Sequence, residues 1–128
     1  MSISIIQLGT PRRRNEGVRF GTVRRPPRGV PKGRVAAEDW FDVWLPTLSP
    51  STRLLSSTRN SQSPKWEETF RRRFMAEMKR SEARHVLDVL AALSHSSNFA
   101  IGCYCEEEAH CHRRILRHLL RQRGASIR

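Results

Sequence analysis

The sequence predicts an α/β fold: a single compact three-layer domain, residues 1–128, with a small mixed or mostly parallel sheet flanked by helices. Short apolar, β-branched runs alternate with longer segments whose apolar residues recur at helical spacing. A chain of 128 residues suits one domain, and no internal repeat divides it. Only 38% of residues are hydrophobic and the mean hydropathy is −0.60, but the apolar residues cluster, which argues against disorder.

The first third of the chain predicts two strands, each followed by a basic loop. Residues 3–8 form a short apolar run, and residues 18–23 alternate enough to make a second strand. The polar segment 10–17 between them is rich in arginine. A second basic loop is expected over residues 24–38, because its three prolines lack amide donors and its glycines loosen the backbone.

The middle of the chain predicts a short strand and a loop. Residues 40–45 are aromatic and β-branched and stop at Pro46, which suits an extended segment. We expect Trp40 and Trp44 to belong to the core, since buried aromatic rings contribute large packing areas; a stacking platform is the alternative. Residues 49–51 favour the start of a helical turn, and the polar segment 56–63 predicts a mobile loop.

Two helices follow. Ser63 and Pro64 provide an N-cap and a first helical residue, and the helix should reach about Arg80. Its apolar stripe, expected to face the core, consists of Trp66, Phe70, Phe74 and Met78. A second helix is expected over residues 82–94, with Ser81 as its N-cap.

The last quarter predicts a central strand, a short loop and a helix. Residues 99–105 alternate in polarity and size, and residues 106–109 form an acidic connector. Apolar residues at helical spacing between 115 and 120 mark a helix that Gly124 should end. Residues 125–127 could add a terminal edge strand.

The charge of the chain points to an anionic partner. The formal net charge is +12, and 21 of the 24 basic residues are arginines because only Lys32, Lys65 and Lys79 are lysines. The planar guanidinium suits phosphate, so a nucleotide or nucleic acid is the first expectation, although coding bias also produces arginine excess. Three cysteines cannot all pair, and no apolar run follows Met1 as in a secretory signal, so we expect the cytoplasm. No segment approaches the roughly 20 apolar residues of a membrane span, so no membrane partner is expected; the oligomeric state is left open.

The residues with distinctive chemistry gather after the expected central strand. Ligands of open α/β sheets bind beyond the carboxyl ends of strands, and Cys105 and Cys111 bracket such a place. A helix that begins near residues 110–112 would direct free amides and its positive dipole end at an anion, and Arg113 adds charge. The same field stabilises a thiolate, so Cys111 is the candidate nucleophile and His112 its candidate base. Adjacent helical residues point about 100° apart, so the two need not cooperate directly.

Three other interpretations compete for these residues. Cys111 can be a small buried hydrophobe. Cys103, Cys105, Cys111 and His112 supply enough ligands for zinc, but their spacing lacks the Cys-x2-Cys pairs of ribbons and fingers, so we expect no metal and no cofactor. The pattern from Cys111 to Arg117 outlines a cysteine phosphatase loop but lacks the glycine that lets such a loop wrap phosphate.

With these residues the chain resembles the bacterial domain of unknown function 488 family over nearly its whole length. The segments that carry the resemblance are Gly17-x-Arg19, Pro27-Arg28-Gly29, Trp44 to Ser51, Trp66 with Phe70, and Cys103-Tyr104-Cys105-Glu106 with Cys111-His112-Arg113. A common family form has Asp and Trp where this chain has Val23 and Pro26, so any acid/base role of that aspartate is absent here. The resemblance implies a compact three-layer α/β domain and no established activity.

Two functions lead. The first is a cytoplasmic anion-binding protein that recognises nucleotide or nucleic-acid phosphate through Arg24, Arg28 and Arg113. The alternative is a small thiol-dependent enzyme with Cys111 as nucleophile, assisted by His112, on a phosphorylated or nucleobase-like substrate. Further candidate site residues are Arg19, Gly29 and Cys105. A third possibility is an interaction protein whose basic face binds an acidic protein.

Overall fold

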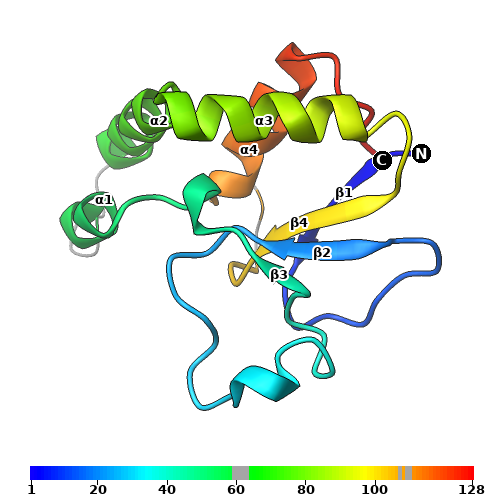
Figure 1. The fold of residues 1–128 in the computed structure, drawn as a ribbon. Helices are drawn as coiled ribbons and strands as arrows, with labels where there is room; N and C mark the ends of the chain where they lie inside the picture. The colour runs from blue at the N-terminus through cyan, green and yellow to red at the C-terminus, as the bar shows by residue number, and fades with distance from the viewer. Residues whose placement is uncertain (59–63, 107, 109–110) are drawn as a thin grey trace.

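The computed structural model describes residues 1–58, 64–106, 108 and 111–128, and it confirms the α/β class. Within these residues the strands form one four-stranded sheet of order β1-β4-β2-β3, with every pair parallel (Figure 1). The strands are β1 (Ile3–Gln7), β2 (Val18–Gly21), β3 (Val43–Trp44) and β4 (Phe99–Cys103). The mostly parallel sheet expected from the sequence is therefore present.

The predicted central strand lies inside the sheet. All five residues of β4 are buried, and its Ile101 lies opposite Ile5 of β1 and Phe20 of β2. The strand ends at Cys103, two residues earlier than predicted, so Cys105 lies beyond the sheet. A nearly continuous apolar run is what a parallel strand covered on both faces requires.

Four helices cover one face of the sheet (Figure 1). They are α1 (Thr52–Thr58), α2 (Pro64–Met78), α3 (Ser81–Leu93) and α4 (His112–Gln122). The core beneath them includes the fully or almost fully buried side chains of Ile3, Phe74, Leu87, Phe99, Ile101, Leu116 and Leu120. The expected stripe of α2 enters this core unevenly, since Phe74 and Met78 are buried while Trp66 and Phe70 are half-buried.

Several expected boundaries differ from those observed. α1 includes residues 56–58, which were predicted to be loop; residues 59–63, with the expected Ser63 cap, lie outside the described residues. Ser81 is the first residue of α3 rather than its N-cap, a position that Arg80 takes with extended dihedral angles. Gly124 ends α4 as predicted, at a φ of +77° and with its amide donating to Arg121. The predicted edge strand 125–127 is a single parallel bridge between Ile127 and Ile3.

The other face of the sheet is covered by residues 24–42, which contain the 3-10 helix η1 (Lys32–Arg34) (Figure 1). Val35 and Phe41 of this layer pack with Ile6 and Ala100 of the sheet in a second apolar cluster. Gly21 permits this packing, because a Cβ atom there would lie 2.4 Å from the ring of Phe41. A loop with one short helix thus forms the third layer.

The predicted strand 40–45 is much shorter than expected. Only Val43 and Trp44 pair with β2, and both are exposed. The expectation that Trp44 is core was wrong: its side chain is 44% exposed, and its indole N–H donates to the carbonyl of Val23 at 2.7 Å. Trp40 is half-buried and packs against the second apolar cluster.

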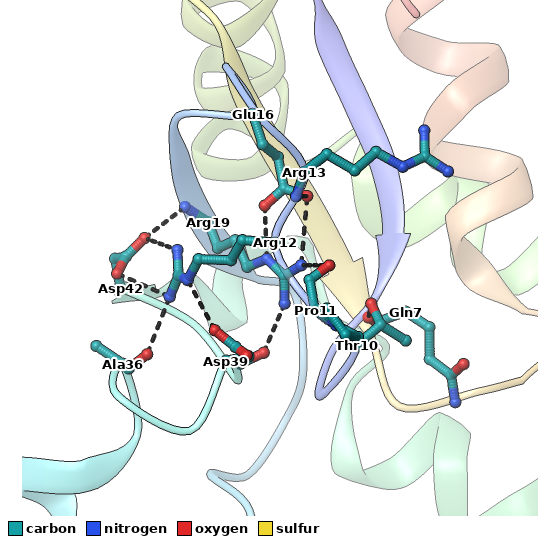
Figure 2. A network of polar contacts seen from close by, with 10 residues as sticks. All are labelled: Gln7, Thr10, Pro11, Arg12, Arg13, Glu16, Arg19, Ala36, Asp39 and Asp42. Carbon is teal, nitrogen blue, oxygen red and sulfur yellow. Dashed lines mark hydrogen bonds and ion pairs between the residues drawn. The ribbon is translucent and has the colours of Figure 1, made fainter.

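A polar network fastens the third layer to β2 (Figure 2). The fully buried guanidinium of Arg19 pairs with Glu16 at 2.6 Å and donates to the carbonyl of Asp39 at 2.5 Å. Arg12 donates to the carboxylates of Asp39 and Asp42, and Asp42 also accepts the backbone N–H of Arg19. Burial would raise the pKa of Asp42, but the hydrogen bonds from Arg12 and the Arg19 backbone outweigh it and lower that pKa.

No helix in the described parts of the chain has the length and apolar character needed to cross a membrane.

Candidate functional site

A cleft of about 670 Å³ opens at the carboxyl ends of β2 and β4, where ligands of parallel sheets commonly bind. The basic loop contributes Arg24, Arg25 and Arg28 to its lining. Two aromatic residues, Trp40 and Tyr104, form another part of the wall. Cys103, Cys105 and His112 also line the cleft.

Two buried cysteines and a histidine meet beside this cleft. Cys103 is the last residue of β4, Cys111 is the N-cap of α4, and His112 is the first residue of that helix. Their two sulfur atoms and one imidazole nitrogen all lie within 4.8 Å of one another. The described residues contain no other such group of three or more histidine, cysteine or acidic side chains. The sheet and α4 thus bring together residues that lie eight or nine positions apart in the sequence.

Cys111 and His112 are in direct contact, which their adjacency in a helix does not require. The Sγ of Cys111 lies 3.6 Å from Nδ1 of His112. Cys111 has φ −121° and ψ 154°, so it lies outside the helix. The angle of about 100° between successive helical side chains therefore does not apply to this pair.

The imidazole of His112 is held in one orientation. Its Nε2 lies 2.7 Å from the carbonyl oxygen of Thr22, and because a carbonyl only accepts, Nε2 carries a proton. The edge of the ring meets Phe74, with centroids 5.5 Å apart. Thr22 is itself held, because its hydroxyl donates to the carbonyl of Gly102 at 2.9 Å. These contacts leave Nδ1 of His112 facing the sulfur of Cys111.

The three thiols share protons unequally. Hydrogen bonds to Cys105 and Cys111 raise the pKa of Cys103, which therefore keeps its proton. The hydrogen bond from Cys103 lowers the pKa of Cys105, and nearby Arg113 acts in the same direction. The pKa of Cys111 is lowered as well, first by Cys103. Since Cys105 is the exposed member, negative charge is most easily accepted at the cleft.

Arg113 braces the loop that carries Cys105. Its side chain is buried, and Nη2 donates to the carbonyl of Cys105 at 2.7 Å. Its Nε is buried without a hydrogen-bond partner, and Arg113 forms no ion pair with any described residue. The expected anion ligand is thus a buried cation that does not line the cleft and instead borders a separate pocket with Gln7 and Glu108.

The other two expected anion ligands differ in their availability. Arg24 donates to the carbonyls of Pro46, Ser49 and Pro50, each at 3.1 Å, and so joins the basic loop to the segment before α1. Arg28 is exposed on the cleft. Arg25, which sequence reasoning missed, is exposed there too, and the part of the chain that the structure describes holds no side-chain partner for either.

Two further expected site residues, Arg19 and Gly29, do not line the cleft. Arg19 is buried in the network of Figure 2. Gly29 is an exposed residue of the basic loop with a φ of +73°.

Cys111 also lines a separate cavity of about 430 Å³ beside α2, with Trp66, Arg71 and Arg114.

Tyr104 is a second cleft residue that the sequence did not single out. It lies edge-on to Trp40, with ring centroids 5.8 Å apart. Its hydroxyl donates to the carbonyl of Arg25 at 2.8 Å, and burial raises its pKa to about 12. The sequence signals were its place in the predicted alternating strand 99–105 and in the motif Cys103-Tyr104-Cys105-Glu106, and neither reveals Trp40 as its neighbour.

A family model described as DUF488-N3a, the active DUF488-N3 subclade, matches residues 3–124. The chain belongs to this family. The match confirms the resemblance found in the sequence, and it spans every strand and helix of the DUF488-N3a fold described above. Searches of curated proteins and of solved structures gave no match.

Proposed function

We propose that this DUF488-N3a protein binds a nucleotide, free or within a nucleic acid, in the cleft at the carboxyl edge of its sheet. One observation carries the proposal: the cleft places two exposed, unpartnered arginines beside an aromatic pair. Its volume of about 670 Å³ is in the range of about 300–1,000 Å³ that small-molecule sites occupy.

The arginines provide the phosphate-binding part. Arg25 and Arg28 are exposed, so their guanidinium groups can form bidentate hydrogen bonds with phosphate without breaking a protein contact. Arg24 fixes the start of the same loop through its three carbonyl contacts. The net charge of +12 adds long-range attraction for any polyanion.

The aromatic residues provide a surface for a base. Trp40 and Tyr104 both line the cleft, and Gly9 allows the Trp40 ring to pack closely, since a Cβ there would lie 2.8 Å from it. Stacking of a base on an aromatic side chain contributes about 1–3 kcal/mol. A ligand with both phosphate and base would use both parts of the cleft.

The test is binding of single-stranded oligonucleotides and of free nucleotides, measured against salt concentration. For a single strand the logarithm of affinity should fall with the logarithm of salt concentration, with a slope of about −0.7 for each phosphate that the protein neutralises. Arg25→Ala and Arg28→Ala should each weaken binding and make the slope shallower. Arg84→Ala removes an exposed arginine of α3 and is the matched control for net charge.

Two outcomes would overturn the proposal. One is no binding at low salt. The other is an equal decrease of affinity in Arg28→Ala and Arg84→Ala, because binding would then depend on total charge and not on the cleft.

Trp40→Leu should weaken binding of nucleotides more than binding of inorganic polyphosphate, which has no base.

The matching family is described as the active DUF488-N3 subclade, which supports a reaction as the second candidate function. The reactive groups that line the cleft are Cys103, Cys105 and His112.

A further inference from the structure

We infer that Cys103, Cys111 and Nδ1 of His112 form a three-ligand binding site for a divalent zinc-class cation beside the cleft. This inference does not depend on nucleotide binding, since it is carried by the arrangement of the ligand atoms alone.

The distances suit a tetrahedral ion. Ligands at typical zinc distances to sulfur and nitrogen lie about 3.5–3.8 Å from one another around the metal. The sulfur of Cys111 and Nδ1 of His112 are already 3.6 Å apart, and all three atoms of the cluster lie within 4.8 Å of one another. A decrease of about 1 Å or less in the distances between these atoms would therefore bring all three within coordination distance of one ion.

The orientation of His112 is the one that a metal ligand needs. A coordinating histidine usually donates its other ring N–H to a carbonyl or carboxylate, which fixes the tautomer and the ring. Here Nε2–H donates to the carbonyl of Thr22 at 2.7 Å, and Nδ1 is directed at the sulfur of Cys111. The lone pair of Nδ1 consequently faces the cluster.

Cys105 is exposed on the cleft that Cys103 and His112 also line, but it is not one of the three converging residues. Three protein ligands leave one position of a tetrahedral ion for water or for a ligand in the cleft, an arrangement that open catalytic zinc sites share.

The sequence spacing had argued against a metal, because it lacks the paired Cys-x2-Cys of zinc ribbons and fingers. That rule concerns ligands held on one tight turn. Here the end of β4 supplies Cys103, and the start of α4 supplies Cys111 and His112.

The rival use of the same atoms is a nucleophilic Cys111 with His112 as base. Such a thiol must reach its substrate, but Cys111 is 6% exposed, and it lines the smaller cavity beside α2 and not the cleft that carries Arg25 and Arg28. A nucleophile also has no need of the sulfur of Cys103. Both points favour coordination.

The experiment titrates the reduced, metal-free full chain with Zn²⁺, Co²⁺ or Cd²⁺ alone, with no nucleotide present. We expect one ion per chain, release of thiol protons into the buffer, tetrahedral Co²⁺ absorption and sulfur-to-metal charge-transfer bands. Because no nucleotide is used, this result and the nucleotide-binding result can fail separately.

The variants test each ligand. Cys111→Ser and His112→Asn should weaken binding by about 100-fold or more, beyond the effect of losing a supporting residue. Since both side chains are buried, circular dichroism of each metal-free variant shows whether it is folded, and Co²⁺ absorption of the unaltered chain tests the site independently of any variant. His85→Asn removes an exposed histidine of α3 and should change nothing.

The inference is overturned if the folded, reduced chain binds none of the three ions. It is also overturned if folded Cys111→Ser and His112→Asn bind as the unaltered chain does, which would indicate an adventitious surface site. Rapid alkylation of Cys111 in a chain that binds no metal would favour the thiol-dependent enzyme instead.

Discussion

Arg19 illustrates how a charged residue can be structural in a basic protein. Its guanidinium is fully buried, as is the carboxylate of Glu16, and the two are 2.6 Å apart. Two carbonyls, those of Pro11 and Asp39, accept its remaining N–H groups (Figure 2). The pair holds the first loop and the third layer together, so a family motif residue that suggested a ligand contact is here an anchor.

Removal of one partner should be costly. Arg19→Met leaves the Glu16 carboxylate buried without its cation, and we expect a loss of about 3–5 kcal/mol in the free energy of unfolding. Urea denaturation followed by circular dichroism measures it. Arg14→Met, at an exposed position of the same loop, should change stability by less than about 0.5 kcal/mol. Equal effects of the two changes would show that the buried pair does not anchor the loop.

At the scale of elements, the turn before β2 depends on one glycine. Gly17 has a φ of +82°, and a Cβ there would lie 1.9 Å from the carbonyl oxygen of Asn98, just before β4. The close approach lets β2 and β4 start side by side. Gly29 has a similar φ of +73°, but nothing lies within 4 Å of the position of its Cβ.

These two glycines make a matched pair. Gly29→Ala should cost about 1 kcal/mol, the strain of a left-handed alanine. Gly17→Ala adds a collision with backbone to the same strain, and we expect at least about 3 kcal/mol or failure to fold. Thermal and urea unfolding of both variants give the difference. If both lose the same stability, the contact with Asn98 is not restrictive.

At the scale of the whole molecule, the sheet is covered by two layers of different character. The helical layer is held by a large apolar core, whereas residues 24–42 are held by a smaller apolar cluster and the polar network around Arg12 and Arg19. The cleft lies where the second layer, the carboxyl ends of the strands and α4 meet. The basic loop that lines the cleft therefore belongs to the layer that is held by the smaller apolar cluster.

Acid should weaken this layer through Asp42. Its folded-state pKa is lowered, so its stabilising contribution is complete above the unfolded value of about 3.9 and is lost as pH falls through the folded value. Because the side chain is 32% exposed, we expect Asp42→Asn to cost only about 0.5–1 kcal/mol at neutral pH. The difference from the unaltered chain should shrink as pH falls through the lowered folded-state pKa of Asp42.

Unfolding midpoints at several pH values test this, with hydrogen exchange of residues 24–42 as the local readout. Glu82→Gln, an exposed carboxylate outside the network, is the control. A pH-independent difference between Asp42→Asn and the unaltered chain would contradict the assignment.

The sequence alone determined the features that depend on neighbours along the chain. The apolar run of β4, the helical spacing of α2, α3 and α4, and the stop at Gly124 are local patterns, because a strand or helix repeats within a few residues. The position after β4 was also predictable as the candidate site, since ligands of parallel sheets bind at that edge. The family followed from motifs that stand in the sequence itself.

Only the tertiary structure decided which arginines can bind a ligand and which cysteines lie close together. Arg24 and Arg25 are adjacent and chemically identical, but Arg24 meets three carbonyls from residues 46–50 while Arg25 faces the cleft. Cys103 and Cys111 converge with His112 because the chain leaves the sheet and returns to start α4 at the same place. Hydrogen bonding and coordination depend on which distant atoms come within about 3–4 Å, and no local pattern encodes that distance.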